Sequence, residues 1–216
     1  MTNRIIVLIT ILIAFSNITF AQKTNKITLD KNVSIKLPAS YTIMSDDDIA
    51  SRYPSYRKPI AMYISDDRMA DFGYNVSNGV WGNDIELLRK VYKSTIMNNF
   101  NKVTFIKDTI VTIKKRKYIL FEYISEVSDE NNASGQKKSI KTYTNSKYAL
   151  QNGEIYIFNF NCPEKLKDKY QLQANQILST VKINLIPNNH KATVIEPNSK
   201  NPNLKKKPEN PYQKNK

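Results

Sequence analysis

The stretches that decide the fold are three successive runs: YILFEYISEV at 118–127, SIKTYTNSKYAL at 139–150 and EIYIFNFN at 154–161. Each run is rich in β-branched and aromatic residues, a composition typical of strands. A polar loop at 128–138 separates the first two runs, and Asn152-Gly153 separates the last two. Asn-Gly is a strong signal for a two-residue hairpin turn. These runs therefore predict an antiparallel meander.

Outside the meander, alternating apolar residues predict further strands. Residues 26–38 (KITLDKNVSIKLP) place the turn residues Asp30-Lys31-Asn32 between two alternating runs, which is the pattern of a β-hairpin. Three more strands are expected at 60–65 (IAMYIS), 70–77 (ADFGYNVS) and 103–113 (VTFIKDTIVTI). The last of them turns into the meander through Lys114–Lys117.

Helices are expected at three places. Ser45 followed by Asp46–Asp48 is typical of an N-cap with an acidic first turn, and Pro54 ends that short helix. A longer helix is predicted from Asn83, which stands three residues before Glu86 as in a capping box. Its apolar stripe consists of Ile85, Leu88, Tyr92 and Ile96, widened by Leu87 and Val91.

The last helix follows the strand at 154–161, and Pro163 suits its first position. The apolar face of this helix is formed by Leu166, Tyr170, Ala174, Ile177, Leu178 and Val181. Consecutive hairpins imply an antiparallel sheet, and amphipathic helices must bury their apolar faces on it. The predicted fold class is therefore α+β, an antiparallel β-sheet covered by helices, in a single domain spanning residues 22–186.

The two ends of the chain differ in composition from this domain. Residues 1–21 combine Arg4, an apolar run and Ala21, as in a secretory signal peptide cleaved before Gln22; the alternative is an uncleaved membrane anchor. After cleavage we expect no transmembrane segment and a periplasmic or secreted protein. Residues 187–216 hold five of the nine prolines and few apolar residues, so we expect a disordered basic tail.

Positive charge extends along the whole chain. Of the net charge of +14, residues 1–21 contribute +1, residues 22–186 contribute +8 (25 basic, 17 acidic) and residues 187–216 contribute +5 (7 basic, 2 acidic). An exported basic protein meets anionic lipid, surface polysaccharide or acidic partners before it meets nucleic acid. We therefore expect no nucleic-acid partner and a weak contact of the tail with anionic surfaces.

Residue types that carry chemistry are scarce. The only histidine, His190, lies in the tail, so residues 22–186 lack an imidazole for Ser-His-Asp, Cys-His and most zinc arrangements. The single cysteine, Cys162, excludes an intramolecular disulfide. Its apolar surroundings favour a buried thiol, with pairing between chains as the alternative. We predict no catalytic residue, no cofactor and no metal site.

Acidic residues leave two alternatives open. Asp46–Asp48 lack the EF-hand spacing with a distal Glu, so a helix N-terminus is preferred over a calcium site. Glu122, Glu126, Asp129 and Glu130 lie in or beside one hairpin. These carboxylates could serve a hydrolase that needs no histidine, although strands and loops carry surface acids routinely.

The candidate partner-binding residues are Trp81, Tyr74 and Asn83, which lie around the loop leading into the long helix. Aromatic side chains on a loop are candidate anchors for a partner. The free N–H groups at the start of a helix suit an acidic or carbonyl ligand. The alternative interpretation places Trp81 in the core between sheet and helix.

The order of these elements resembles the PsbP-like fold group, which joins the extrinsic photosystem II protein, a Ran-binding nuclear import factor and small bacterial periplasmic proteins. Four features carry the resemblance over residues 26–186: VSIKLPASY at 33–41, NDIELLRKVYKSTIMNNF at 83–100, KKRKYILFEY at 114–123, and the closing strand and Cys-Pro leading to a helix that ends in ILSTVKI at 177–183. The resemblance implies an α/β/α sandwich in a group whose members mostly dock onto larger assemblies. The group shares no catalytic motif, and its photosynthetic members bind metal, for which this sequence has no matching ligand set.

We therefore expect an exported, non-catalytic accessory or binding module that docks onto a protein or cell-envelope component. Two alternatives stay open. One is a secreted hydrolase that uses carboxylates alone. The other is a polyanion-binding envelope protein that acts through the tail and Lys114–Lys117.

Loss of the tail is expected to leave the stability of the domain unchanged. A chain that ends at Pro187 should melt within about 1 °C of the chain that ends at Lys216, because surface changes away from core features usually alter stability by no more than about 0.5 kcal/mol. Differential scanning calorimetry of the two chains measures this. A drop of several degrees in the shorter chain would show that the tail docks onto the domain.

Overall fold

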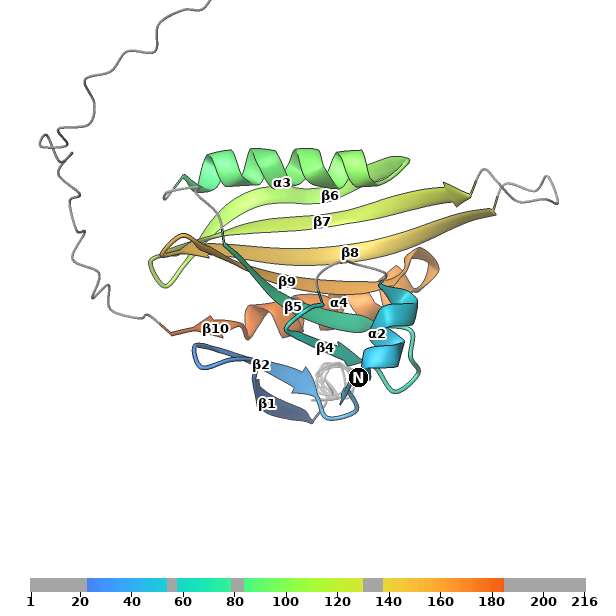
Figure 1. The fold of residues 1–216 in the computed structure, drawn as a ribbon, viewed down its shortest axis with the longest axis horizontal. Coiled ribbons are helices and arrows are strands. Elements are labelled where there is room, and N and C mark those ends of the chain that lie inside the picture. The colour runs from blue at the N-terminus through green and yellow to red at the C-terminus, as the bar shows by residue number, and fades with distance from the viewer. Residues whose placement is uncertain (1–22, 54–57, 79–83, 130–137, 185–216) are drawn as a thin grey trace, which may run out of the picture. The chain divides into compact units, whose positions relative to one another are not determined.

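Two antiparallel sheets organise the described part of the chain, which comprises residues 23–53, 58–78, 84–129 and 138–184 of the computed structural model (Figure 1). The chain divides into two units, Met1–Leu185 and Ile186–Lys216, and every described residue belongs to the first. The predicted tail and the predicted signal peptide lie outside the described residues.

The larger sheet contains the predicted meander. Its strands are β3 (Thr42–Ile43), β4 (Ala61–Ile64), β5 (Asp71–Asn78), β6 (Lys102–Ile113), β7 (Arg116–Asp129), β8 (Lys138–Gln151) and β9 (Glu154–Pro163). They are arranged in the order β3-β4-β5-β9-β8-β7-β6. The meander β6-β7-β8-β9 is confirmed, and β5 joins it by pairing with β9. The centre of the sheet is therefore formed by two paired strands, β5 and β9, that lie far apart in the sequence.

The smaller sheet contains the predicted N-terminal hairpin. Its strands are β1 (Thr24–Thr28), β2 (Val33–Pro38) and β10 (Lys182–Ile183), in the order β1-β2-β10. The carboxylate of Asp30 accepts hydrogen bonds from the backbone N–H groups of Asn32 and Val33, which fixes the hairpin turn. The two-residue strands β3 and β10 were not predicted, because they are too short to show an alternating pattern.

Helices cover both faces of the larger sheet. They are α2 (Asp46–Arg52), α3 (Ile85–Asn99) and α4 (Lys167–Ser179), the last preceded by a 3₁₀ turn, η1 (Glu164–Leu166). Ile49 of α2 packs with Met62 and Ile64 of β4, and Leu88 of α3 packs with Phe121 of β7, all on one face. On the opposite face α4 and the smaller sheet share a core with β5, β8 and β9. The predicted α+β class is confirmed.

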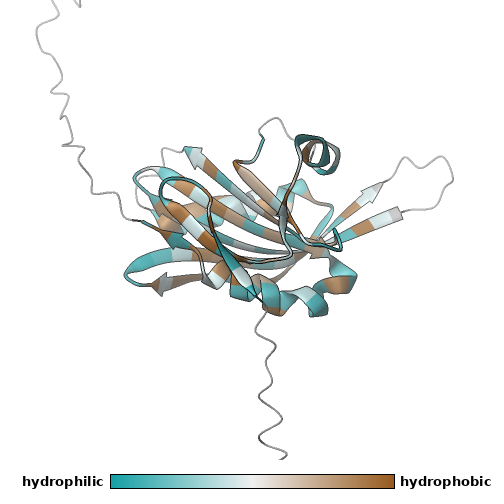
Figure 2. Ribbon diagram, turned by 90° about the horizontal axis from the view of Figure 1, so that it is seen from below, coloured by the Kyte–Doolittle hydropathy of each residue, from teal (hydrophilic) through white to brown (hydrophobic). Residues whose placement is uncertain are grey.

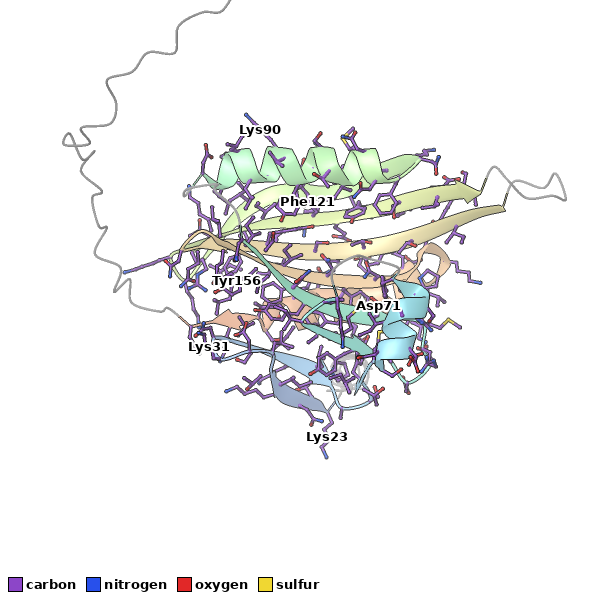
Figure 3. The ribbon with its side chains drawn as sticks, viewed as in Figure 1. Lys23, Lys31, Asp71, Lys90, Phe121 and Tyr156 are labelled. Carbon is purple, nitrogen blue, oxygen red and sulfur yellow. The ribbon has the colours of Figure 1, made fainter. Side chains whose placement is uncertain are left out.

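The core follows from side-chain alternation along the strands. On β9, Ile155 packs on the α3 side, whereas Tyr156, Phe158 and Phe160 pack on the α4 side. Figure 2 shows hydrophobic (brown) and hydrophilic (teal) segments along the strands, and Figure 3 shows Phe121 beneath α3. Because both faces of β9 are covered, each of its residues is buried or half-buried.

Two predicted helix starts are wrong by one residue. The N-cap of α3 is Asp84, whose carboxylate accepts the N–H of Leu87 at 2.9 Å, and not Asn83. An aspartate and an asparagine cap equally well, so the sequence did not separate them. Pro163 ends β9 and caps the 3₁₀ turn instead of occupying the first helical position. The predicted N-cap Ser45 of α2 is confirmed.

Ion pairs join α3 and α4 to strands or turns of the larger sheet. Arg89 Nη1 and Lys93 Nζ of α3 each lie 2.7 Å from the carboxylate of Asp108 on β6. Burial would raise the pKa of Asp108, but hydrogen bonds from Lys93 and Arg89 outweigh it and hold the pKa below its usual value. Near α4, Lys169 lies 2.7 Å from Asp67 in the turn between β4 and β5.

Strand β6 forms one edge of the larger sheet and has a neighbour, β7, on one side only among the described strands. Its register shifts between Phe105 and Lys107, which leaves Ile106 45% exposed. Lys102 and Lys107 are also exposed on this strand.

The packing of α3 predicts unequal effects at two adjacent leucines. Leu88 is fully buried, whereas Leu87 is 46% exposed. Leu88→Ala should lower the free energy of unfolding by about 2–5 kcal/mol, because it removes buried methyl groups and leaves a cavity. Leu87→Ala is the matched control and should cost well under about 1 kcal/mol. Urea midpoints measure both, and equal effects at the two positions would contradict the packing of α3 on the sheet.

A buried lysine lies between the larger sheet and α4. Lys147 is 3% exposed, its Nζ donates to the carbonyl oxygen of Leu178 at 3.0 Å, and it lies 4.4 Å from the ring centre of Tyr118. No ion pair is recorded for Lys147 among the described residues. Burial lowers its pKa to about 8.

This lysine makes stability depend on pH. Above a folded-state pKa of about 8 and below the unfolded value near about 10.4, the unfolded chain binds more protons than the folded one, so stability rises with pH. Lys147→Met has no ammonium group at this position, so its stability does not rise with pH for this reason. The unfolding free energy of wild type minus that of Lys147→Met should therefore increase between pH 7 and pH 10, by up to about 3 kcal/mol. Urea titrations across this range measure it, and a constant difference would show that the ammonium is not desolvated.

Candidate functional site

The predicted partner-binding residues do not form a site in the described structure. Tyr74 is fully buried, stacks on Phe158 with ring centres 5.3 Å apart, and donates its hydroxyl hydrogen bond to Asp30. Burial, followed by the hydrogen bond to Asp30, raises the pKa of Tyr74 above its usual value. Tyr74 is thus a core residue, which corrects its prediction as a surface anchor. Trp81 and Asn83 lie outside the described residues, and their role stays a prediction.

The described carboxylates among those considered for a hydrolase accept hydrogen bonds from neighbouring side chains. Glu122 is buried and accepts hydrogen bonds from Tyr143 at 2.9 Å and Gln171 at 2.5 Å. Glu126 accepts the hydroxyl of Ser139 at 2.5 Å. The side chains of Asp129 and Glu130 lie outside the described part of the chain. Nothing in this arrangement favours carboxylate chemistry over structural hydrogen bonding.

The thiol and the possible metal ligands also show no arrangement suited to a reaction among the described residues. Cys162 is 3% exposed, and burial, followed by the charge of Asp71, raises the pKa of its thiol to about 12. A thiol in such surroundings is unreactive. Within the described ranges no three His, Cys, Asp or Glu side chains are placed to hold a metal ion, and no helix is long and apolar enough to cross a membrane.

Basic side chains gather at one end of the molecule. We call this set the basic end; it consists of Lys31, Lys114, Lys115, Arg116, Lys117 and Lys182. Three contacts bring its segments together, one from a side chain and two between backbone groups. Arg116 donates to the carbonyl oxygen of Ile183 at 2.9 Å, Lys182 pairs with Ser34, and the N–H of Asn184 donates to Asn32. The turns β1–β2 and β6–β7 and strand β10 therefore meet here (Figure 1).

The cations of the basic end are available to a partner. All five lysines are exposed, and none of the six side chains forms an ion pair with another residue in the part of the chain that the structure describes. The nearby carboxylates are occupied by phenols: Asp30 accepts the hydroxyl of Tyr74, and Glu154 accepts that of Tyr156 at 2.7 Å. Figure 3 shows Lys31 and Tyr156 at this end. Both carboxylates keep their negative charge, so the six cations leave an excess of positive charge at this end.

The turn between β6 and β7 keeps lysines where other residues fit better. Lys114 and Lys115 have φ of 49° and 66°, the left-handed region that costs a residue with a side chain about 1 kcal/mol or more. The next hairpin turn, Asn152-Gly153, meets the same demand with the residues that suit it, at φ of 54° and 78°. The Lys114-Lys115 turn therefore lowers stability relative to a turn made of residues that favour positive φ.

Sequence reasoning identified part of the basic end. The run Lys114–Lys117 was visible as a basic cluster, but its proximity to Lys31 and Lys182 depends on β10, which the sequence did not predict. The positive φ values of the lysines were also not visible, because no Gly or Asn marks that turn.

Together these elements define the class of the fold. The antiparallel sheet has α3 and α2 on one face and α4 with a small hairpin sheet on the other. This is the PsbP-like arrangement, and the resemblance found in the sequence is confirmed at the level of the fold.

One solved structure, that of a cyanobacterial PsbP, supports the same class. Cyanobacterial PsbP (CyanoP) of Synechocystis sp. PCC 6803 superposes with a TM-score of 0.55 at 9% identity, covering 77% of this chain and 96% of that chain. The Ran-binding protein Mog1p of Saccharomyces cerevisiae gives 0.45 at 10% identity over 76% of this chain and 96% of its own. LpqN of Mycobacterium tuberculosis, which is involved in cell envelope biogenesis, gives 0.45 at 12% identity over 76% and 91%.

No protein-family model matches the chain, and no curated protein matches it by sequence. The likeness to CyanoP therefore establishes the fold, and the function has to be argued from the residues of this chain.

Proposed function

We propose that this protein is an exported, non-catalytic binding module that docks onto the cell envelope by placing its basic end on an anionic membrane surface. The observation that carries the proposal is the set of six cations at one end, two of them held in a strained turn. Each lysine or arginine near an anionic bilayer contributes about 1 kcal/mol of binding, so a cluster of this size is sufficient for reversible attachment.

Two further observations support a membrane surface over a protein partner. The basic end is assembled from three chain segments and presents mainly lysines, which bind as mobile point charges and not as geometric forks. Ile113, next to the lysine turn, is 42% exposed and supplies an apolar group at the level of the headgroups.

Export is supported by the apolar run that follows Arg4 near the N-terminus. The non-catalytic part of the proposal rests on the lack of histidine in residues 22–186. The hydrolase alternative has no observation in its favour among the described carboxylates. The contact of the tail with anionic surfaces, predicted from its composition, would add to that of the basic end.

The double variant Lys114→Asn/Lys115→Gly separates charge from folding. It should raise the free energy of unfolding by about 1 kcal/mol, because Asn-Gly suits a turn with two positive φ values. It should also weaken binding to vesicles by at least about tenfold, because two cations are lost. Co-sedimentation with phosphatidylcholine vesicles containing about one third phosphatidylglycerol, at about 0.05 M and about 0.3 M NaCl, measures the binding.

Two controls accompany this variant. Lys114→Arg/Lys115→Arg keeps the charge and should bind as wild type does. Lys90→Gln/Lys107→Gln removes the same charge from exposed positions outside the basic end, and should reduce binding only slightly. If both double variants lost the same amount of vesicle binding, the binding would depend on the net charge of the protein and not on the basic end. Binding to pure phosphatidylcholine vesicles as strong as to anionic ones would overturn the proposal.

A further inference from the structure

The larger sheet ends at β6, which has no strand on its second side in the part of the chain that the structure describes (Figure 1). The other outermost strands are shorter: β3 and β10 have two residues each, and β1 has five. Strand β6 has 12 residues. The backbone N–H and C=O groups along a free edge are available to pair with another chain. β6 is therefore the longest described edge to which an extended segment can add.

The register shift divides β6 into a protected half and a regular half. Before and at the shift lie Lys102 and the exposed Ile106, and both a bulge and a lysine are features that protect edge strands from pairing. After the shift, residues 107–113 pair with β7 over seven successive residue pairs. Residues 109–113 are Thr-Ile-Val-Thr-Ile, five β-branched residues in succession. This composition favours strand pairing, so the regular half keeps an edge that is competent to pair.

The hairpin turn shows which backbone groups of the regular half are free. The two-residue turn at 114–115 has positive φ at both positions, so Ile113 and Arg116 close the hairpin as a hydrogen-bonded pair. Along an antiparallel ladder, pairs that are hydrogen-bonded alternate with pairs that are not. The residues of the regular half that direct their backbone groups away from β7 are therefore Asp108, Ile110 and Thr112.

The charge that is free at this edge is positive. Lys107, at the start of the regular half, is exposed and forms no ion pair with another residue within the described ranges. Asp108 is already bonded by Arg89 and Lys93 of α3, each at 2.7 Å. Opposite charges on paired strands attract each other. The edge therefore suits a strand that carries negative charge opposite Lys107.

A second copy of this chain does not meet that requirement. If two copies paired antiparallel about Ile110, Lys107 of one copy would lie opposite Ile113 of the other, next to the lysine turn at 114–115. Like charges beside each other destabilise strand pairing. Residues 187–216 of the chain are basic as well, so they suit this edge no better. The charge therefore selects an acidic segment of another protein.

We propose that the regular half of β6 binds an extended, acidic segment of a partner protein by antiparallel strand addition. The free backbone groups of β6 supply the affinity, and an acidic residue opposite Lys107 supplies the preference for this partner. The segment becomes the outermost strand of the larger sheet. This surface and this class of partner differ from the membrane contact of the basic end, and the proposal does not depend on that contact.

The experiment is an NMR titration of the ¹⁵N-labelled protein with the peptide acetyl-TVTVTEE-amide, in the absence of lipid. Antiparallel pairing places the two glutamates of the peptide at the Lys107 end of the strand. The peptide should cause saturable shifts along β6, with a Kd of about 1 mM or below. At saturation, hydrogen exchange should slow at least about tenfold at the amides of Asp108, Ile110 and Thr112. The amides between them, which β7 already holds, should change little.

Two control peptides separate strand pairing from charge. TPPVTEE keeps the charge but lacks N–H groups at two neighbouring positions, one of which has to face β6. It should bind at least about tenfold more weakly. TVTVTKK keeps the N–H groups and reverses the charge, and it should bind about threefold to tenfold more weakly because its lysines lie opposite Lys107.

Three variants of the protein test the same assignment. Lys107→Glu should reverse the preference, so that TVTVTKK binds better than TVTVTEE. Lys26→Glu makes the same change of charge at an exposed position of β1 and should keep the preference of wild type. Thr112→Pro removes one free N–H at an exposed position. It should abolish the protection while the protein stays folded, because an edge strand tolerates proline where the N–H is unpaired.

Three results would each overturn the proposal. The first is the absence of saturable shifts with TVTVTEE. The second is binding of TPPVTEE as strong as that of TVTVTEE, or protection that does not alternate along β6, because the contact would then not be strand addition. The third is an unchanged peptide preference in Lys107→Glu, which is read independently of whether Thr112→Pro folds. None of these results bears on vesicle binding, which is measured at the basic end.

Discussion

The pairing of β9 with β5 is the constraint on which the rest of the structure depends. β9 pairs over eight residue pairs with β5 and over ten with β8, so it joins the first half of the chain to the meander. Both edges of β9 are thus paired, and because other elements pack on both faces of the sheet, its side chains alternate between two cores. The positions of α3 and α4 on opposite faces follow from that alternation.

The two faces of the sheet are built differently. On the α4 side, aromatic residues such as Phe72, Phe158 and Phe160 fill the core, and the buried polar groups Glu122 and Lys147 all have partners. On the α3 side, two separate apolar clusters leave polar residues between them. Unpartnered buried side-chain atoms occur on both faces: Ser146 Oγ and Asn159 Oδ1 on the α3 side, and Gln151 Oε1 on the α4 side.

The sequence predicted most of the fold and little of the sites. Long strands and helices were readable from alternation and from caps such as Ser45, whereas β10 has too few residues to give a pattern. Tyr74 was misread because an aromatic residue near a loop resembles an anchor, and only the pairing of β5 shows that it is buried.

The edge strand β6 has a consequence for how copies of the protein behave at high concentration. A long free edge offers unpaired backbone groups to any other strand, and an extended flat edge promotes association between chains. The register shift at Phe105–Lys107 interrupts that edge, and Lys102 and Lys107 place like charges along it. Edge-to-edge joining of two copies would have to align these interruptions and bring the lysines together. The irregularity in β6 therefore disfavours edge-to-edge pairing of two copies through this strand.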